Sequence, residues 1–392
     1  MMAEKIQRRD WVNRFELIGK PKISEYTFNI DVKSKKSSWI YNSMSLYVDC
    51  GEKHGDIQCE MMGGYSEDGE NYIYAHGKDS NDDKKDDFSK KITVKWEDRF
   101  NKEVLNSIGN SCFIRVGLEK NDENKTFYKD FLSEYDAIKY IKEHIEKDMV
   151  LRIKGDLEYS LFNDNVYVKK KIKSIVLSQI DDTTKYGAKF MQSILIDKNS
   201  VDLKDADKST GLLPVYATVL DYVKEVNGKE IRGFYPMEKV FDYQLNLKKS
   251  DKWQNVYNKF FKVKKGYTQL NFVGELVENG TTTITYEDLP DEIKELIDIG
   301  AFELEDALAK CSDNKSKDRK MILLQPLINK TDEDSSNVSS IAKFDERYTI
   351  EEIMEIIPQD DEDEETDEEI DNNFDESLDT DEDDMDWLNN FS

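Results

Sequence analysis

Residues 151–157 read LRIKGDL and residues 270–276 read LNFVGEL, so a short motif recurs at an offset of 119 positions. Apolar residues stand at the first, third and seventh positions of both copies, and a glycine stands at the same place, at Gly155 and Gly274. Alternation of this kind predicts a half-buried strand, and a glycine in mid-strand is typical of a strand that bends sharply. We therefore expect two related β-rich units in the chain.

A segment with helical spacing comes before each copy of the motif. Residues 135–147 and 251–263 repeat apolar side chains every three or four positions, which predicts an amphipathic helix in each. The expected apolar faces are Ala137, Ile138, Ile141 and Ile145 in the first helix and Trp253, Val256, Tyr257, Phe260 and Phe261 in the second. The helices stand at nearly the same distance before the motif, which supports an internal repeat.

Runs rich in β-branched and aromatic residues surround these helices and predict strands. They are residues 23–32, 39–48, 57–62, 149–159 and 165–177 in the first unit, and 189–197, 212–223 and 229–237 in the second. The order of three strands, a helix and two strands is that of the OB-fold, a partly open five-stranded Greek-key barrel. We therefore expect a mainly β (β-rich α+β) protein with two OB-like five-stranded barrels in tandem. The alternative is two unrelated β-rich domains that share the motif by coincidence.

The chain divides into three parts by pattern and charge. We expect an OB-like domain at residues 1–180 with a long insertion at about 66–110, and a second OB-like domain at 185–330 with a helical cap at 289–311. Residues 331–392 contain 26 acidic and 2 basic residues, so they carry 24 of the 27 net negative charges of the chain. Such a segment repels itself and predicts a disordered acidic tail.

The remaining body, residues 1–330, has a net charge of only −3 and contains clusters of lysine. These clusters are Lys33, Lys35 and Lys36, then Lys169, Lys170, Lys171 and Lys173, then Lys262, Lys264 and Lys265. Clustered lysines indicate a local track for phosphates. The alternative is that each cluster is a solvated face.

Several classes of protein do not fit this sequence. It has no run of about 18 apolar residues that would predict a transmembrane helix, and its first residues lack the apolar stretch of a signal peptide. The four cysteines form no C-x-x-C pair, which is typical of reduced thiols rather than a disulfide framework. We expect a soluble cytoplasmic protein, located in the host cytoplasm if a phage encodes it.

Catalytic and metal-binding patterns are also weak. Only His54, His76 and His144 offer imidazole, and no nucleophile elbow, phosphate-binding glycine loop or H-E-x-x-H occurs. Cys50, His54 and Cys59, with Cys112 as a fourth ligand, lack the paired spacing of a structural zinc site. We expect no metal, no cofactor and no enzymatic activity.

Aromatic residues beside lysines point instead to nucleic-acid binding. Trp39, Tyr41 and Tyr47 share one parity of a strand and are expected on one face. Tyr65 and Tyr72 lie in or beside the long insertion. A predicted hairpin carries Tyr159, Phe162 and Tyr167, followed directly by Lys169, Lys170 and Lys171, and the second unit offers a poorer set of Arg232, Tyr235, Lys264 and Lys265. Exposed rings stack on unpaired bases and lysines follow the backbone. The alternative for each ring is core packing.

The last residues of the tail differ from a simple solubilising tail. After the acidic run the chain ends DMDWLNNFS, so apolar residues follow carboxylates directly. Apolar anchors flanked by charge are typical of a docking peptide. The candidate partner-binding residues are Asp384, Asp386, Trp387, Leu388 and Phe391.

These features together resemble single-stranded DNA-binding proteins, in particular the larger versions found in bacteriophage replication modules. The resemblance rests on the OB-like strand order, the aromatic residues and lysines of the first unit, and the acidic terminal peptide with an apolar tip. In bacterial members of that class the tail recruits replication and repair proteins. The resemblance implies that this chain binds single-stranded DNA in replication or recombination and recruits partner proteins through its tail.

Two other functions stay open at this point. The acidic tail could be the functional part of an interaction protein or DNA mimic that binds no DNA itself. Alternatively, the abundant carboxylates could hide a metal-dependent replication nuclease.

Overall fold

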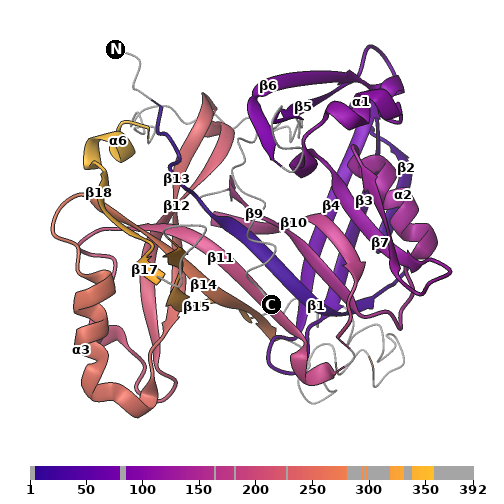
Figure 1. The fold of residues 1–392 in the computed structure, drawn as a ribbon. Coiled ribbons are helices and arrows are strands. Elements are labelled where there is room, and N and C mark those ends of the chain that lie inside the picture. Colours follow the sequence, from indigo (N-terminus) through magenta and orange to yellow (C-terminus); the bar gives the residue numbers. More distant parts are fainter. Residues whose placement is uncertain are drawn as a thin grey trace.

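The structure is a computed structural model that describes residues 5–79, 85–162, 165–180, 182–226, 228–279, 294, 297, 318–330 and 338–356. It is mainly β, as the sequence predicts, and its largest element is a mixed sheet of 14 strands. Figure 1 shows two halves joined side by side, with β1 running between them. None of the helices in the described part of the chain is long and apolar enough to cross a membrane.

The strands of the N-terminal half pair in a closed ring of five. In order of pairing they are β1 (Asn13–Lys22), β3 (Trp39–Asp49), β4 (Asp56–Ser66), β10 (Asn165–Leu177) and β9 (Leu151–Phe162), and β9 pairs back to β1. The β4–β10 pair is parallel and the other pairs are antiparallel. We call this the first ring. The strand predicted at 23–32 is wrong in position. The first strand of the ring, β1, already ends at Lys22, and the predicted range overlaps instead with a short β2 (Phe28–Lys33), which pairs with β3.

The C-terminal half repeats the same pattern of pairing. Its strands are, in order, β11 (Gly187–Ile196), β12 (Leu212–Val226), β13 (Lys229–Gln244), β15 (Asp318–Pro326) and β14 (Tyr267–Asn279), and β14 pairs back to β11. Here β13–β15 is the parallel pair. We call this the second ring. The short 3₁₀ turns η3 (Thr183–Lys185) and η4 (Leu203–Asp205) lie before β11 and before β12.

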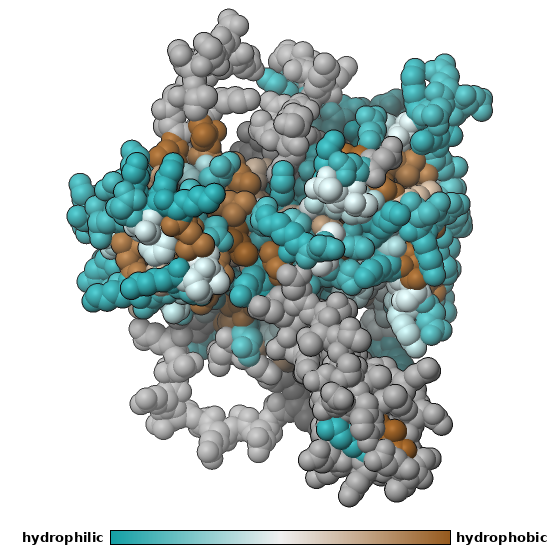
Figure 2. Space-filling view, turned by 90° about the horizontal axis from the view of Figure 1, so that it is seen from below, coloured by the Kyte–Doolittle hydropathy of each residue, from teal (hydrophilic) through white to brown (hydrophobic). Residues whose placement is uncertain are grey.

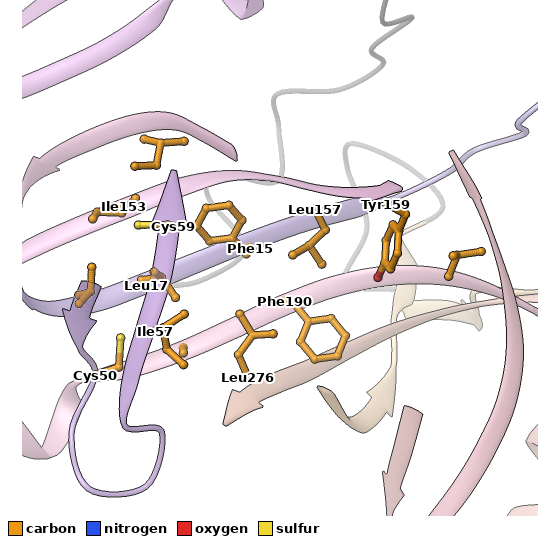
Figure 3. Close-up of a cluster of buried hydrophobic side chains, with 14 of the residues drawn as sticks. Phe15, Leu17, Cys50, Ile57, Cys59, Ile153, Leu157, Tyr159, Phe190 and Leu276 are labelled. Carbon is orange, nitrogen blue, oxygen red and sulfur yellow. The ribbon is translucent and has the colours of Figure 1, made fainter. Parts of the chain in front are cut away.

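The first strands of the two rings pair with each other, so the rings share one continuous core. The β1–β11 ladder sets Phe15 opposite Phe190, and these residues face Gly155 and Gly274 on the neighbouring strands. A methyl group on Gly155 would lie 1.9 Å from the carbonyl oxygen of Lys171, and one on Gly274 would lie 2.3 Å from the Phe190 ring. Figure 3 shows the core side chains of both rings meeting there. The repeated glycines thus allow close approach of strands in both rings.

The predicted helices occupy the same place along the chain in each ring, after β4 and before β9 in the first ring and after β13 and before β14 in the second. α2 (Glu134–His144) begins at Ser133, whose side chain accepts a hydrogen bond from Tyr135 N, and it buries the predicted residues Ala137, Ile138 and Ile141. The second segment is less regular than predicted. It consists of η5 (Leu247–Lys252), a four-residue α3 (Trp253–Val256) and a π turn η6 (Tyr257–Phe261).

The insertion of the first unit has a fold of its own. A separate hairpin, β5 (Tyr72–Lys78) and β6 (Asp86–Lys95), packs with η1 (Trp96–Asp98), α1 (Lys102–Ser107) and η2 (Asn110–Cys112) around a small core of Val94, Ile108 and Leu132. The chain then returns to the large sheet, where β7 (Ile114–Lys120) pairs in parallel with the end of β10 and antiparallel with β8 (Thr126–Phe131).

The predicted start of the disordered tail at residue 331 is too early. Beyond it lie β17 (Val338–Ile341), which pairs with β16 (Ile328–Lys330), and β18 (Lys343–Tyr348), which pairs with β14. α6 (Ile350–Met354) follows with a capping box between Thr349 and Glu352. Tyr348 and Ile353 are buried against the N-terminal Ile6, so this segment belongs to the fold. Of the predicted cap at 289–311 only Lys294 and Ile297 are described, both helical, and residues 357–392 lie outside the described part.

Candidate nucleic-acid interface

The outward side of β3 carries the aromatic residues that the alternation of the strand predicts. Odd-numbered residues of β3 are half-exposed while even-numbered ones are buried. Trp39 and Tyr41 stack with ring centroids 4.8 Å apart and an interplanar angle of 18°. A methyl group on Gly64, opposite Tyr41, would lie 2.8 Å from Trp39 Nε1, so the indole rests on a glycine of β4. Tyr47 lies six residues further along the same side.

Two of the three predicted lysines of β10 lie on this same side. Lys171 pairs in register with Glu60 of β4, and Glu60 lies opposite Ser45 of β3 on the outward side. Lys169 Nζ is 3.4 Å from Glu60 Oε1, and Lys171 Nζ is 3.4 Å from Glu158 Oε1. Tyr167 has the same parity and is exposed. We call the outward side of β3, β4 and β10 the outer face.

The outer face continues onto β7 and β8, which sequence reasoning did not include. Arg115 of β7 pairs in register with Ser174 of β10 and with Asp130 of β8. Its Nε donates to Asp130 Oδ1 at 2.8 Å, and its guanidinium carbon lies 6.0 Å from the centroid of the Tyr128 ring. Tyr128 is exposed. The signal was the three aromatic residues within 126–131, a short run that lies in a polar stretch.

Three predicted binding residues are buried in the core, so their prediction as contacts to a strand is wrong. Tyr159 is 4% exposed and its hydroxyl donates to Gln192 Oε1 of the second ring at 2.8 Å. Burial raises the pKa of the Tyr159 phenol well above its ordinary value. Tyr235 is buried in the second ring, and Lys170 forms a buried ion pair with Glu278.

The other aromatic candidates of the first unit lie away from the outer face or at its margin. Tyr65 lies on the other side of β4 from Glu60, and its ring packs against Trp96 with centroids 5.2 Å apart. Tyr72 is exposed on the β5–β6 hairpin and donates to Glu70, and Phe162 is exposed at the end of β9.

The matching side of the second ring has different chemistry. Tyr216 of β12 lies opposite Val240 of β13, and both are more than half exposed. Their neighbours on this side of β13 are Glu238 and Asp242. The predicted cations of this unit lie elsewhere: Arg232 pairs with Glu230 near the turn of the β12–β13 ribbon, and Lys264 and Lys265 are exposed between η6 and β14. This side is therefore apolar and acidic.

A cleft of about 460 Å³ opens where the outer face ends at Tyr47. Its lining combines apolar, aromatic and charged groups, namely Pro21, Lys22, Ile23, Ser24, Tyr47, Asp56 and Lys147. Lys22 Nζ is held 2.6 Å from Asp56 Oδ2.

The structure separates the residues that were weighed as zinc ligands. His54 Nδ1 lies 2.9 Å from the carbonyl oxygen of Leu276, while Cys112 belongs to the insertion. Burial raises the pKa of the Cys59 thiol to about 12. Within the described ranges, no three His, Cys, Asp or Glu residues are grouped so that they could hold a metal ion.

Residues 73–287 match the YorF family, a span of more than half the chain. The chain belongs to the YorF family. The match begins in β5 and extends past β14, so it includes the β5–β6 hairpin, the β7–β8 extension, β9, β10 and, in the second ring, β11, β12, β13 and β14. Strands β1, β3 and β4, with Trp39, Tyr41 and Tyr47, precede the part of the chain that matches the YorF family. No curated protein matches the chain. The predicted docking residues Asp384, Asp386, Trp387, Leu388 and Phe391 lie outside the described residues.

Proposed function

We propose that this YorF-family chain is a non-enzymatic single-stranded DNA-binding protein of phage replication or recombination, and that each ring is an OB-like barrel. The pairing order supports the barrel. Counted in chain order, the first strand of each ring pairs with the second and fourth, and the third and fifth strands pair in parallel, with a helical segment before the fourth. A five-stranded Greek-key barrel of this kind binds single strands on the side of its second and third strands, which in the first ring are β3 and β4.

The outer face of the first ring carries the proposal. It combines the stacked pair of Trp39 and Tyr41 with Lys169 and Lys171. Every base has a π face, so stacking on such rings binds single strands with little dependence on sequence, while lysines follow the phosphates. The ion pairs of these lysines with Glu60 and Glu158 are partly exposed, and such pairs contribute about 0–1 kcal/mol. A phosphate can therefore replace the carboxylate.

The second ring serves as the natural comparison. Its matching side presents Tyr216 and Val240 next to Glu238 and Asp242, and carboxylates repel a phosphate backbone. We therefore assign strand binding to the first ring.

The test is a titration of the full chain with oligo(dT) and with duplex of equal length, followed by intrinsic fluorescence. Trp39→Ala and Tyr41→Ala should each weaken oligo(dT) binding by about 1–3 kcal/mol, the usual contribution of a stacked base. Tyr216→Ala, which removes an exposed tyrosine from the matching side of the other ring, should leave affinity unchanged. Equal affinity for duplex and single strand, or equal effects of Tyr41→Ala and Tyr216→Ala, would contradict the proposal.

The acidic tail completes the proposed function. Residues 357–392 contain 18 acidic and no basic residues, so they compete with DNA for lysines on the body at a high effective concentration. The tip with Trp387, Leu388 and Phe391 is proposed to recruit replication or recombination proteins in the cytoplasm. Alanine at these three positions should abolish capture of those partners while leaving oligo(dT) binding almost unchanged.

A further inference from the structure

Four side chains that strand binding does not use meet near the end of the β5–β6 hairpin where β5 ends and β6 begins. His76 comes from β5, Asp86 from the start of β6, and Ser111 and Cys112 from η2. His76 Nε2 lies 2.9 Å from Ser111 Oγ and 3.1 Å from Asp86 Oδ2. Cys112 Sγ lies 3.4 Å from His76 Nδ1 and 3.6 Å from Nε2. The His76 imidazole is therefore in contact with both a thiol and a carboxylate.

Asp86 is held as a carboxylate by the backbone around it. Its oxygens accept hydrogen bonds from Asn110 N at 2.6 Å and from Ser111 N at 2.8 Å, and the Ser111 hydroxyl also donates to it. Burial raises the pKa of the Asp86 carboxyl, but the hydrogen bonds from Ser111, His76 and Asn110 outweigh burial, so this pKa lies below its ordinary value. Asp86 is thus ionised at neutral pH and stabilises a positive charge on His76.

The hydrogen-bond partners also decide which nitrogen of His76 faces the thiol as a base. Nε2 lies beside the two oxygens of Ser111 and Asp86, so Nε2 carries a hydrogen in the neutral ring. The nitrogen without a hydrogen is then Nδ1, which lies 3.4 Å from Cys112 Sγ. In addition, the backbone N of His76 donates to the same sulfur at 3.4 Å. Both interactions favour a thiolate paired with an imidazolium.

We infer that Cys112 is a nucleophilic thiol activated by His76 and Asp86, and that it is a modification site for soft electrophiles. The thiol passes its proton to His76 Nδ1. With iodoacetamide the sulfur then attacks the methylene carbon, so a C–S bond forms, the C–I bond breaks and iodide leaves. The surroundings distinguish this thiol from Cys50 and Cys59, which are fully buried. The Phe88 ring packs against the imidazole in a tilted arrangement with centroids 4.4 Å apart, and the carbon chain of Lys90 lies against Gly77.

The site is independent of the proposed strand binding, although it lies in the span that matches the YorF family. It uses a cluster on the insertion, whereas strand binding uses the sheet of the first ring. Cys112→Ser should therefore leave oligo(dT) affinity unchanged.

The experiment is the rate of Cys112 carbamidomethylation in the full reduced chain between pH 5.5 and 9.5, read by peptide mass spectrometry. An ordinary thiol gives a midpoint near pH 8.5. We expect the midpoint for Cys112 at least one pH unit lower, and a rate at pH 7 that is at least about tenfold above that of His76→Asn. Asp86→Asn should move the midpoint upwards.

The wild-type profile decides the inference even if a variant does not fold. A midpoint at or above pH 8.5, or the absence of labelling of Cys112 in the folded chain, would overturn it. Thermal unfolding of His76→Asn shows whether its rate refers to a folded protein.

Discussion

The three consecutive lysines of β10 offer a test of the whole arrangement, because the structure gives the middle one a different role from its neighbours. Lys170 Nζ lies 2.7 Å from Glu278 Oε1, and the two side chains are 9% and 4% exposed. Lys170 belongs to the first ring and Glu278 to the second, so the ion pair joins the rings. Replacing Lys170 should therefore affect stability, whereas replacing Lys169 or Lys171 should affect binding.

The magnitude follows from the burial of both charges. At the effective dielectric constant of about 20 that suits such sites, unit charges 2.7 Å apart attract each other by about 6 kcal/mol. Their desolvation offsets much of this, so the intact pair adds little. Lys170→Met, however, leaves Glu278 buried without its partner, which usually destabilises a protein by about 3–5 kcal/mol. Arg319 Nε lies 3.8 Å from Glu278 Oε2, so part of the charge of Glu278 stays compensated in Lys170→Met. The loss of stability should therefore lie near the lower end of this range.

The assay is urea unfolding at pH 7, with oligo(dT) titration in parallel. The double variant Lys170→Met/Glu278→Leu should recover most of the stability that Lys170→Met loses, because no uncompensated charge is left. Lys169→Met serves as the matched control, with little change in stability. The reasoning is refuted if Lys170→Met lowers DNA affinity as much as Lys169→Met does, or if it lowers stability by less than about 1 kcal/mol.

Three further outcomes are expected. Gly155→Ala should destabilise the chain by about 2 kcal/mol or more in urea unfolding, because its methyl group would overlap the Lys171 carbonyl oxygen, and a neutral effect would exclude the close approach of strands. Truncation after Ile356 should leave the melting temperature unchanged and tighten oligo(dT) binding at low salt. Truncation after Lys330 should lower the melting temperature, because it also removes β18 and α6. Equal melting temperatures of the two truncated chains would contradict this. Burial raises the pKa of the Asp221 carboxyl to about 6, above its unfolded value. This group therefore stabilises the fold at low pH, and the contribution is lost as pH rises through 6. Asp221→Asn should be more stable relative to wild type at pH 7 than at pH 5, and a pH-independent difference in stability would argue against the raised pKa.

Much of the local structure could be predicted from the sequence, because strand and helix periods decide which side of an element a residue takes. The alternation of β3 placed Trp39, Tyr41 and Tyr47 on one side, and the spacing in α2 identified the buried Ala137 and Ile138. The same rule separates Lys170 from Lys169 and Lys171, since neighbours on a strand point to opposite sides. Alternation does not tell which side another element covers.

The strand β1 shows why the rest needed the tertiary structure. Its sequence, NRFELIGKPK, mixes charged and apolar residues, and no local pattern marks it as central. In the fold it lies between β9 and β11, and even Glu16 is buried, 3.1 Å from Lys154. Tyr159 is a second example. No local pattern shows that this tyrosine is buried with its hydroxyl against Gln192 of the other ring.

By itself, the sequence determined the mainly β character, the internal repeat around Gly155 and Gly274, and the separation of an acidic C-terminal region from a nearly neutral body. All of these depend on composition and on periods within a few residues. Only the tertiary structure decided that the two rings share a core, that residues 338–356 fold against Ile6, and that Cys112 meets His76 and Asp86. These contacts join residues far apart in the chain, and the local pattern of a segment carries no information about which distant segment will lie opposite it.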